Sequence, residues 1–117
     1  EIYKNDFNRL KHNLSSFSFS DTETRSAMLE IYNQYSYIAD PHGAVGYLGC
    51  KSYLNENPNA HCVFLETAHP TKFLDVVEGV IKTQIPLPSQ IKSVMLKEKV
   101  ATKISSSEYL KAFLLIY

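Results

Sequence analysis

Near the middle of the chain, a threonine and a histidine lie between an apolar run and a proline. Thr67 and His69 follow the run at residues 62–65 and precede Pro70, which suits the first turn of a helix. If the run is a strand, the turn lies at its carboxyl end, where open α/β sheets bind ligands. Alternatively, either side chain only caps the helix. A hydroxyl can cap a helix and also bond the ring nitrogen of a ligand, so both interpretations stay open.

A second turn of similar composition lies upstream. Asp40 is a good N-cap, and Pro41 suits the first position of a helix predicted over residues 41–54. Each glycine inside a helix costs roughly 0.5–1 kcal/mol relative to alanine, so several in one helix indicate a packing requirement. The small residues that gather on one side of this helix are Gly43, Gly46, Gly49 and Cys50. They would let a neighbouring backbone or a flat ligand approach closely.

Helices must position most of these side chains. Apolar spacing and capping residues predict helices over residues 2–14, 20–35, 70–83 and 89–96, with a last one capped by Ser105 and Glu108. The run at 62–65 is the firm strand, and residues 37–39 are either a second strand or a connector. A buried strand cannot satisfy its backbone alone, so we expect the other strands from outside this chain. The prediction is an α/β class, helix-rich, with one or two strands of a larger sheet.

Composition excludes several kinds of partner. The chain of 117 residues has twelve basic and twelve acidic side chains, with no basic run for nucleic acid and no stretch long enough for a bilayer. Cys50 and Cys62 suit free thiols in a reducing cytosol, so we expect a cytoplasmic protein. The histidines and cysteines lack the close pairing of a zinc site, and no metal is predicted. We expect residues 1–117 to form a single unit, and because Glu1 rather than Met comes first, a segment of a longer chain.

Two sequence stretches together resemble threonine synthase, a pyridoxal-phosphate (PLP) enzyme. Residues 66–73, Glu-Thr-Ala-His-Pro-Thr-Lys-Phe, are similar to the family's Ser/Ala-Thr-Ala-His-Pro-Ala-Lys-Phe. Residues 40–47, Asp-Pro-His-Gly-Ala-Val-Gly-Tyr, are similar to its Asp-Pro-His-Thr-Ala-Val-Gly-Tyr, and order and spacing also agree. Gly43 and Glu66 depart from this pattern, in which a threonine and a small residue stand. The resemblance implies the C-terminal portion of an enzyme with the tryptophan-synthase-β-like fold.

The resemblance also implies a role for each matching residue. Thr67 corresponds to the threonine that contacts the pyridine nitrogen of PLP, where a neutral hydroxyl bonds the nitrogen without keeping it protonated. Possible site-shaping residues are Asp40, Pro41, His42, Ala68, His69 and Lys72. Lys72 has two interpretations, a solvated side chain or a catalytic or phosphate-binding lysine. For His42 and His69, capping and hydrogen bonding are sufficient explanations, and no catalytic residue is assigned within this chain.

The family's reaction requires parts that this sequence does not contain. The Schiff-base lysine of the family is followed by Asp, and no Lys-Asp pair or Gly-rich phosphate loop occurs among the 117 residues. The resemblance therefore implies a segment that is inactive alone and acts with the N-terminal remainder of the enzyme, a lyase that converts O-phosphohomoserine and water to threonine and phosphate. Two alternatives stay open: a stand-alone helical protein-interaction module, and another PLP-dependent elimination or replacement enzyme.

Overall fold

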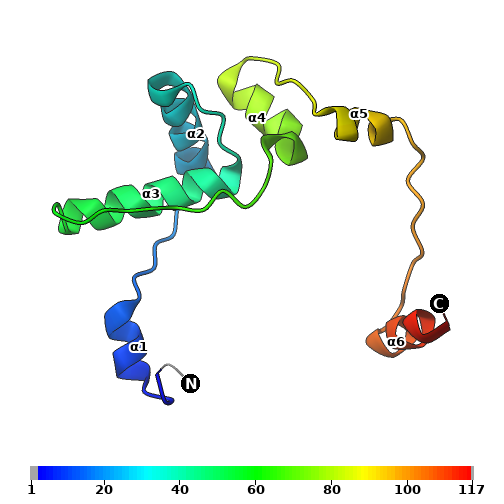
Figure 1. The fold of residues 1–117 in the computed structure, drawn as a ribbon, viewed down its shortest axis with the longest axis horizontal. Coiled ribbons are helices and arrows are strands. Elements are labelled where there is room, and N and C mark those ends of the chain that lie inside the picture. Colours follow the sequence, from blue (N-terminus) through cyan, green and yellow to red (C-terminus); the bar gives the residue numbers. More distant parts are fainter. Residues whose placement is uncertain (1–2, 117) are drawn as a thin grey trace. The chain divides into compact units, whose positions relative to one another are not determined.

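The computed structural model describes residues 3–116, which form two compact units, Glu1–Pro86 and Leu87–Tyr117 (Figure 1). The division falls inside the stretch Ile85-Pro86-Leu87-Pro88, whose prolines cannot continue a helix. The first unit contains α1 (Phe7–Asn13), α2 (Asp21–Tyr35), α3 (Pro41–Glu56), the short 3₁₀ helix η1 (Pro70–Phe73) and α4 (Leu74–Ile81). The second unit contains α5 (Ser89–Met95) and α6 (Ser107–Ile116).

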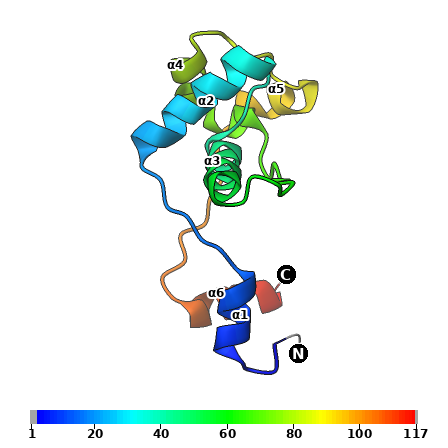
Figure 2. The same ribbon diagram turned by 90° about the vertical axis from the view of Figure 1, so that its left-hand side faces the viewer.

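Three helices supply the core of the first unit. In Figure 2, α3 is seen nearly end-on and α2 crosses it, with α4 packed against α2. The most deeply buried large side chains are Met28 of α2, Val77 of α4 and Asp40, which precedes α3. The other apolar members of this core are Ala27, Ile31, Ala39, Ala44, Ile81 and Ile85. The core therefore fixes the amino-terminal end of α3, one of the two places that the site predictions single out, and also α4, which follows the other.

The cap of α2 forms as its sequence predicts. Ser20 accepts a hydrogen bond from the Glu23 amide at 3.3 Å, and the Glu23 carboxylate accepts one from the Ser20 amide at 2.7 Å. This reciprocal capping box starts the helix, which ends at Ser36 in the left-handed conformation.

Two other helices begin later than predicted. A helix over residues 2–14 is predicted; residue 2 lies outside the described residues, and α1 begins only at Phe7. Lys4 and Asn5 have φ values of 48° and 60°, which a right-handed helix cannot contain, and Asp6 caps the later start by accepting from Arg9 at 3.0 Å. In α6 the cap is Ser106, whose hydroxyl accepts from the Tyr109 amide at 3.1 Å, so the prediction of Ser105 is wrong by one residue.

No strand forms among residues 3–116. The run at 62–65, predicted as a strand, and residues 37–39, predicted as either a strand or a connector, lie outside any helix or strand, and in Figure 1 residues 62–65 run back along α3. A strand requires a neighbouring backbone with free hydrogen-bonding groups, whereas a helix offers only side chains. The prediction that the chain is helix-rich is confirmed, and residues 3–116 form no sheet.

The segment at 62–65 nevertheless alternates like a strand. Cys62 and Phe64 are half-buried against α3, whereas Val63 and Leu65 are 88% and 78% exposed. One face of the segment is covered, and the opposite face presents two apolar side chains. The expectation of a run buried on both faces is thus met on one face only within this chain.

The second unit is more exposed to solvent than the first. None of its described residues is buried, and large apolar side chains such as Leu96 and Ile116 are 96% and 80% exposed. Two short helices of 7 and 10 residues cannot enclose a core by themselves. The side chains that position the predicted site therefore all come from the first unit.

Candidate functional site

Asp40 anchors the first turn of α3. Its side chain is fully buried, and its Oδ1 accepts from the His42 amide at 2.7 Å. The same oxygen lies 3.0 Å from His42 Nδ1. Pro41 occupies the first helical position, so the predicted cap and start of α3 are confirmed. Asp40 Oδ2 is also buried and accepts no hydrogen bond within the described part of the chain.

His42 connects α3 to the end of η1. Its ring lies 5.1 Å from the ring of Phe73 at an interplanar angle of 53°, while its Nδ1 faces Asp40. The imidazole thus has a hydrogen-bonding partner on one side and an aromatic contact on the other. These contacts give His42 a role in packing and orientation.

His69, rather than Thr67, caps the helix that follows the second turn. Its Nδ1 accepts from the Thr71 amide at 3.2 Å and lies 2.9 Å from the Thr71 hydroxyl. Pro70 takes the first position of η1. Thr67 is exposed, and its side chain makes no hydrogen bond to any of the described residues. Since the cap is already provided, the Thr67 hydroxyl is available to a group outside this chain.

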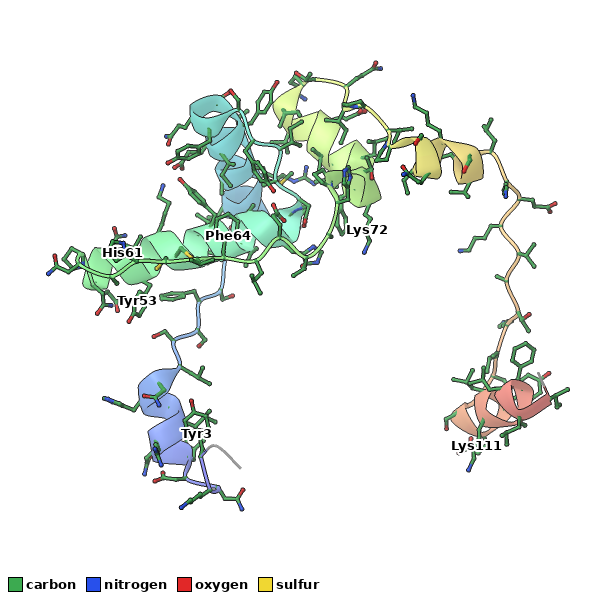
Figure 3. The ribbon with its side chains drawn as sticks, in the orientation of Figure 1. Tyr3, Tyr53, His61, Phe64, Lys72 and Lys111 are labelled. Atoms are coloured by element: carbon green, nitrogen blue, oxygen red, sulfur yellow. The ribbon has the colours of Figure 1, made fainter. Side chains whose placement is uncertain are left out.

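Two of the glycines of α3, Gly43 and Gly46, receive residues 62–66 of the same chain, whereas Gly49 faces Phe17. A Cβ added to Gly46 would lie 3.2 Å from the Cβ of Phe64, and one added to Gly43 would collide with the Glu66 carboxyl group. Figure 3 shows Phe64 beside α3, and its ring lies 6.3 Å from that of Tyr47. The close approach predicted from these glycines is therefore made by the segment that leads into Thr67.

Glu66 brings a second carboxyl group to the buried Asp40. Burial raises the pKa of Glu66, and the adjacent Asp40 raises it further, to about 7. Burial acts in the same direction on Asp40, but the hydrogen bond from the His42 amide, the neighbouring Glu66 carboxyl group and the His42 ring outweigh it and lower the pKa of Asp40. The Tyr37 hydroxyl lies beside the pair, and burial, Glu66 and Asp40 raise its pKa. Of the two carboxyl groups, Glu66 is the one whose raised pKa favours the protonated form below about pH 7.

The predicted site residues fall into two groups. Asp40, Pro41 and His42 form the turn before α3, and Thr67 to His69 form the turn before η1, with Ala68 half-buried. Lys72 lies on η1, exposed and without an ion pair to any described residue, and Figure 3 shows it pointing away from the helix. Glu66 joins the two groups through its contacts with Gly43 and Asp40.

Two further features of the first unit have no counterpart among the sequence predictions. A pocket of about 430 Å³ is lined by Ser36, Tyr37, Ile38, His69, Pro70, Ile85 and Pro86. On the other side of α3, Glu30 accepts from the Tyr47 hydroxyl at 2.6 Å and pairs with Lys51 at 2.7 Å. Burial and the Glu30 carboxylate raise the pKa of Tyr47. Both features join residues distant in sequence, for which no local spacing gives a signal.

Other kinds of site find no support in the described residues. Within 3–116, no group of three or more histidine, cysteine or acidic side chains is arranged to hold a metal ion. No helix in that range has the length and apolarity needed to cross a bilayer.

Comparison with known proteins identifies the family. The family described as "Threonine synthase, C-terminal" matches residues 43–114. This chain belongs to the threonine synthase family. Its relatives include the threonine synthase of Buchnera aphidicola subsp. Acyrthosiphon pisum, 36% identical over 90 residues, or 74% of this chain and 20% of that protein. That of Buchnera aphidicola subsp. Baizongia pistaciae is 34% identical over 119 residues, or 98% of this chain and 26% of that protein.

Further comparisons define how much of the enzyme the chain represents. The threonine synthase of Haemophilus influenzae is 36% identical over 78 residues, or 67% of this chain and 18% of that protein. The chain thus spans about a fifth of the length of these relatives and corresponds to the C-terminal part of a threonine synthase. No solved structure matches it at comparable significance.

Proposed function

We propose that the full-length protein containing this chain is a cytoplasmic, PLP-dependent threonine synthase that converts O-phosphohomoserine and water to threonine and phosphate. The membership of this chain in the threonine synthase family supports that activity. The N-terminal remainder would supply the Schiff-base lysine and the phosphate-binding loop. This segment alone is therefore expected to be inactive.

Thr67 is the residue through which this segment would hold the cofactor. The observation that carries the assignment is an exposed hydroxyl with no partner among the described residues, directly before a helix that His69 already caps. Such a group fits a ring nitrogen, to which a hydroxyl donates without transferring its proton. When bound, PLP supplies the electron sink that this chemistry requires.

The remaining site-shaping residues would orient Thr67. His69 fixes the turn that follows it, and the contacts of Glu66 fix the residue that precedes it. Asp40, Pro41 and His42 hold the end of α3 on which that turn rests, and Lys72 remains a solvated side chain at the edge of the site.

The extended segment at 62–65 would join the sheet of the whole enzyme, in the tryptophan-synthase-β-like arrangement. Its face away from α3 presents Val63 and Leu65, which suit a strand covered on both sides. With neighbouring strands present, the segment would place Thr67 at the carboxyl end of a strand, where α/β sheets bind ligands.

The test is substitution of Thr67 in the full-length protein. Thr67→Val keeps the shape but removes the hydroxyl, and leaving a buried ring nitrogen unpartnered costs roughly 1–3 kcal/mol. PLP affinity or turnover should fall about tenfold or more. Thr67→Ser, which retains the hydroxyl, should stay within about threefold of the wild type. If Thr67→Val folds normally and equals the wild type in PLP titration and in turnover, the cofactor role is wrong.

A further inference from the structure

Two of the positions that depart from the family pattern, Gly43 and Glu66, lie in direct contact. Gly43 is buried in the first turn of α3, and the space that its Cβ would occupy contains the Glu66 carboxyl group. This is the tightest contact at any of the four glycines; at Gly79, for comparison, nothing lies within 4 Å of an added Cβ. The Glu66 carboxyl group therefore fills the space that the missing side chain of Gly43 leaves.

Asp40 gives the Glu66 carboxyl group a partner. Oδ1 of this fully buried residue serves the helix cap, whereas the buried Oδ2 lacks a donor among residues 3–116. A buried acceptor without a donor is destabilising. Of the titratable groups around it, Glu66, Tyr37 and His42, the last already bonds Oδ1. Two ionised carboxylates are both acceptors only, so a bond between Asp40 and Glu66 requires one proton.

We propose that protonated Glu66 donates a hydrogen bond to Asp40 Oδ2, and that this carboxylic acid–carboxylate pair, accommodated by Gly43, fastens the turn containing Thr67 to the start of α3. Glu66 is thereby a positioning residue that acts on the cofactor contact through the backbone of its neighbour. The pair itself is independent of cofactor chemistry. Only its consequence for Thr67 rests on the proposed function.

The proton gives the pair a defined pH dependence. A carboxyl group whose pKa rises on folding contributes stability below its unfolded pKa, near 4.5, and loses it as the pH passes the folded value of about 7. Above that pH both carboxyl groups are charged and repel each other. Because the Glu66 residue as a whole is exposed, solvent screening reduces the effect.

The first test compares urea unfolding of the full-length protein at pH 5.5 and pH 8.5. In Glu66→Gln, an amide N–H donates to Asp40 Oδ2 without titrating. The unfolding constant of the wild type should rise between the two pH values by about tenfold more than that of Glu66→Gln. Glu66→Ala should be destabilised at pH 5.5 relative to both. Equal pH dependence in the wild type and Glu66→Gln would overturn the protonated pair.

The second test is a double-mutant cycle between the two positions. Gly43→Ala places a Cβ against the carboxyl group and should raise the unfolding constant about tenfold or more in the wild type. In a Glu66→Ala background the same change should have less than about a threefold effect. Gly79→Ala is the matched control, expected to be neutral or stabilising in both backgrounds. If Gly43→Ala has the same effect in both backgrounds, the complementarity is wrong.

PLP titration of the same variants tests the positioning role. Glu66→Gln should keep the cofactor affinity within about threefold of the wild type, whereas Glu66→Ala should lower it about fivefold or more. Unchanged affinity in Glu66→Ala would refute positioning while leaving the unfolding results as evidence for the pair. Thr67→Val in the same titration separates the outcomes, since its failure to lower affinity counts against the proposed function alone.

Discussion

Two turns of this protein are built on the same local plan and differ in burial. In each, a side chain accepts from the amide two residues ahead, and proline takes the first helical position: Asp40 caps α3, and His69 caps η1. Asp40 is fully buried, whereas His69 is exposed. The buried turn holds the architecture, and the exposed turn leaves the Thr67 hydroxyl without a partner among the described residues. Tertiary burial, rather than the capping sequence, separates the turn that anchors the fold from the turn that we propose faces the cofactor.

The largest effect that this comparison predicts is at the buried cap. Asp40→Ala removes the acceptor for the His42 amide and leaves a space in the core, so it should destabilise the full-length protein by about 2 kcal/mol. Asp40→Asn retains a capping oxygen and should lose less than about 1 kcal/mol. The measurement is urea unfolding at pH 5.5, where Glu66 is protonated.

If Asp40→Ala were as stable as the wild type, the claim that the buried turn anchors the fold would be wrong. Equal stability would mean that burying the Asp40 carboxyl group costs as much stability as its cap contributes. Greater loss in Asp40→Asn than in Asp40→Ala would contradict the capping role itself.

Local chemistry made most of the helices predictable. Ser20 with Glu23, and Asp40 with Pro41, specify their helix starts within a few residues, and the structure has those starts where the sequence predicts them. The errors arose where a neighbouring serine could cap equally well, at Ser105 and Ser106, and where left-handed residues shortened α1. Such choices depend on backbone conformations that side-chain periodicity does not encode.

Contacts between distant residues were less predictable. The glycines of α3 indicated a close approach but not its occupant, because the sequence cannot show that residues 62–66 fold back along that helix. The proximity of Glu66 to Asp40 was unpredictable for the same reason, because it also depends on residues 62–66 folding back along α3. The segment at 62–65 is a different case: its alternation is present, but no neighbouring strand occurs among residues 3–116 to pair with it.

A smaller effect is predicted at the exposed cap. His69→Ala removes the acceptor for the Thr71 amide, which water can replace, so stability should fall by only about 0.5–1 kcal/mol in the full-length protein. His69→Asp, a better N-cap, should restore it. Urea unfolding gives the stability, and PLP titration should show a loss of less than about fivefold. A loss in His69→Ala as large as in Asp40→Ala would show that the two turns are equally important to the fold.

The smallest effect is predicted just beyond the exposed cap, at Lys72. Its side chain is exposed and has no ion pair among residues 3–116, so the stability of Lys72→Ala should stay within about 0.5 kcal/mol of the wild type. Turnover and the Michaelis constant for O-phosphohomoserine should change less than about twofold. A phosphate-binding lysine would behave differently, since its loss would weaken substrate binding and Lys72→Arg would rescue it. A tenfold rise in the Michaelis constant with that rescue would extend the ligand-facing surface from Thr67 to η1.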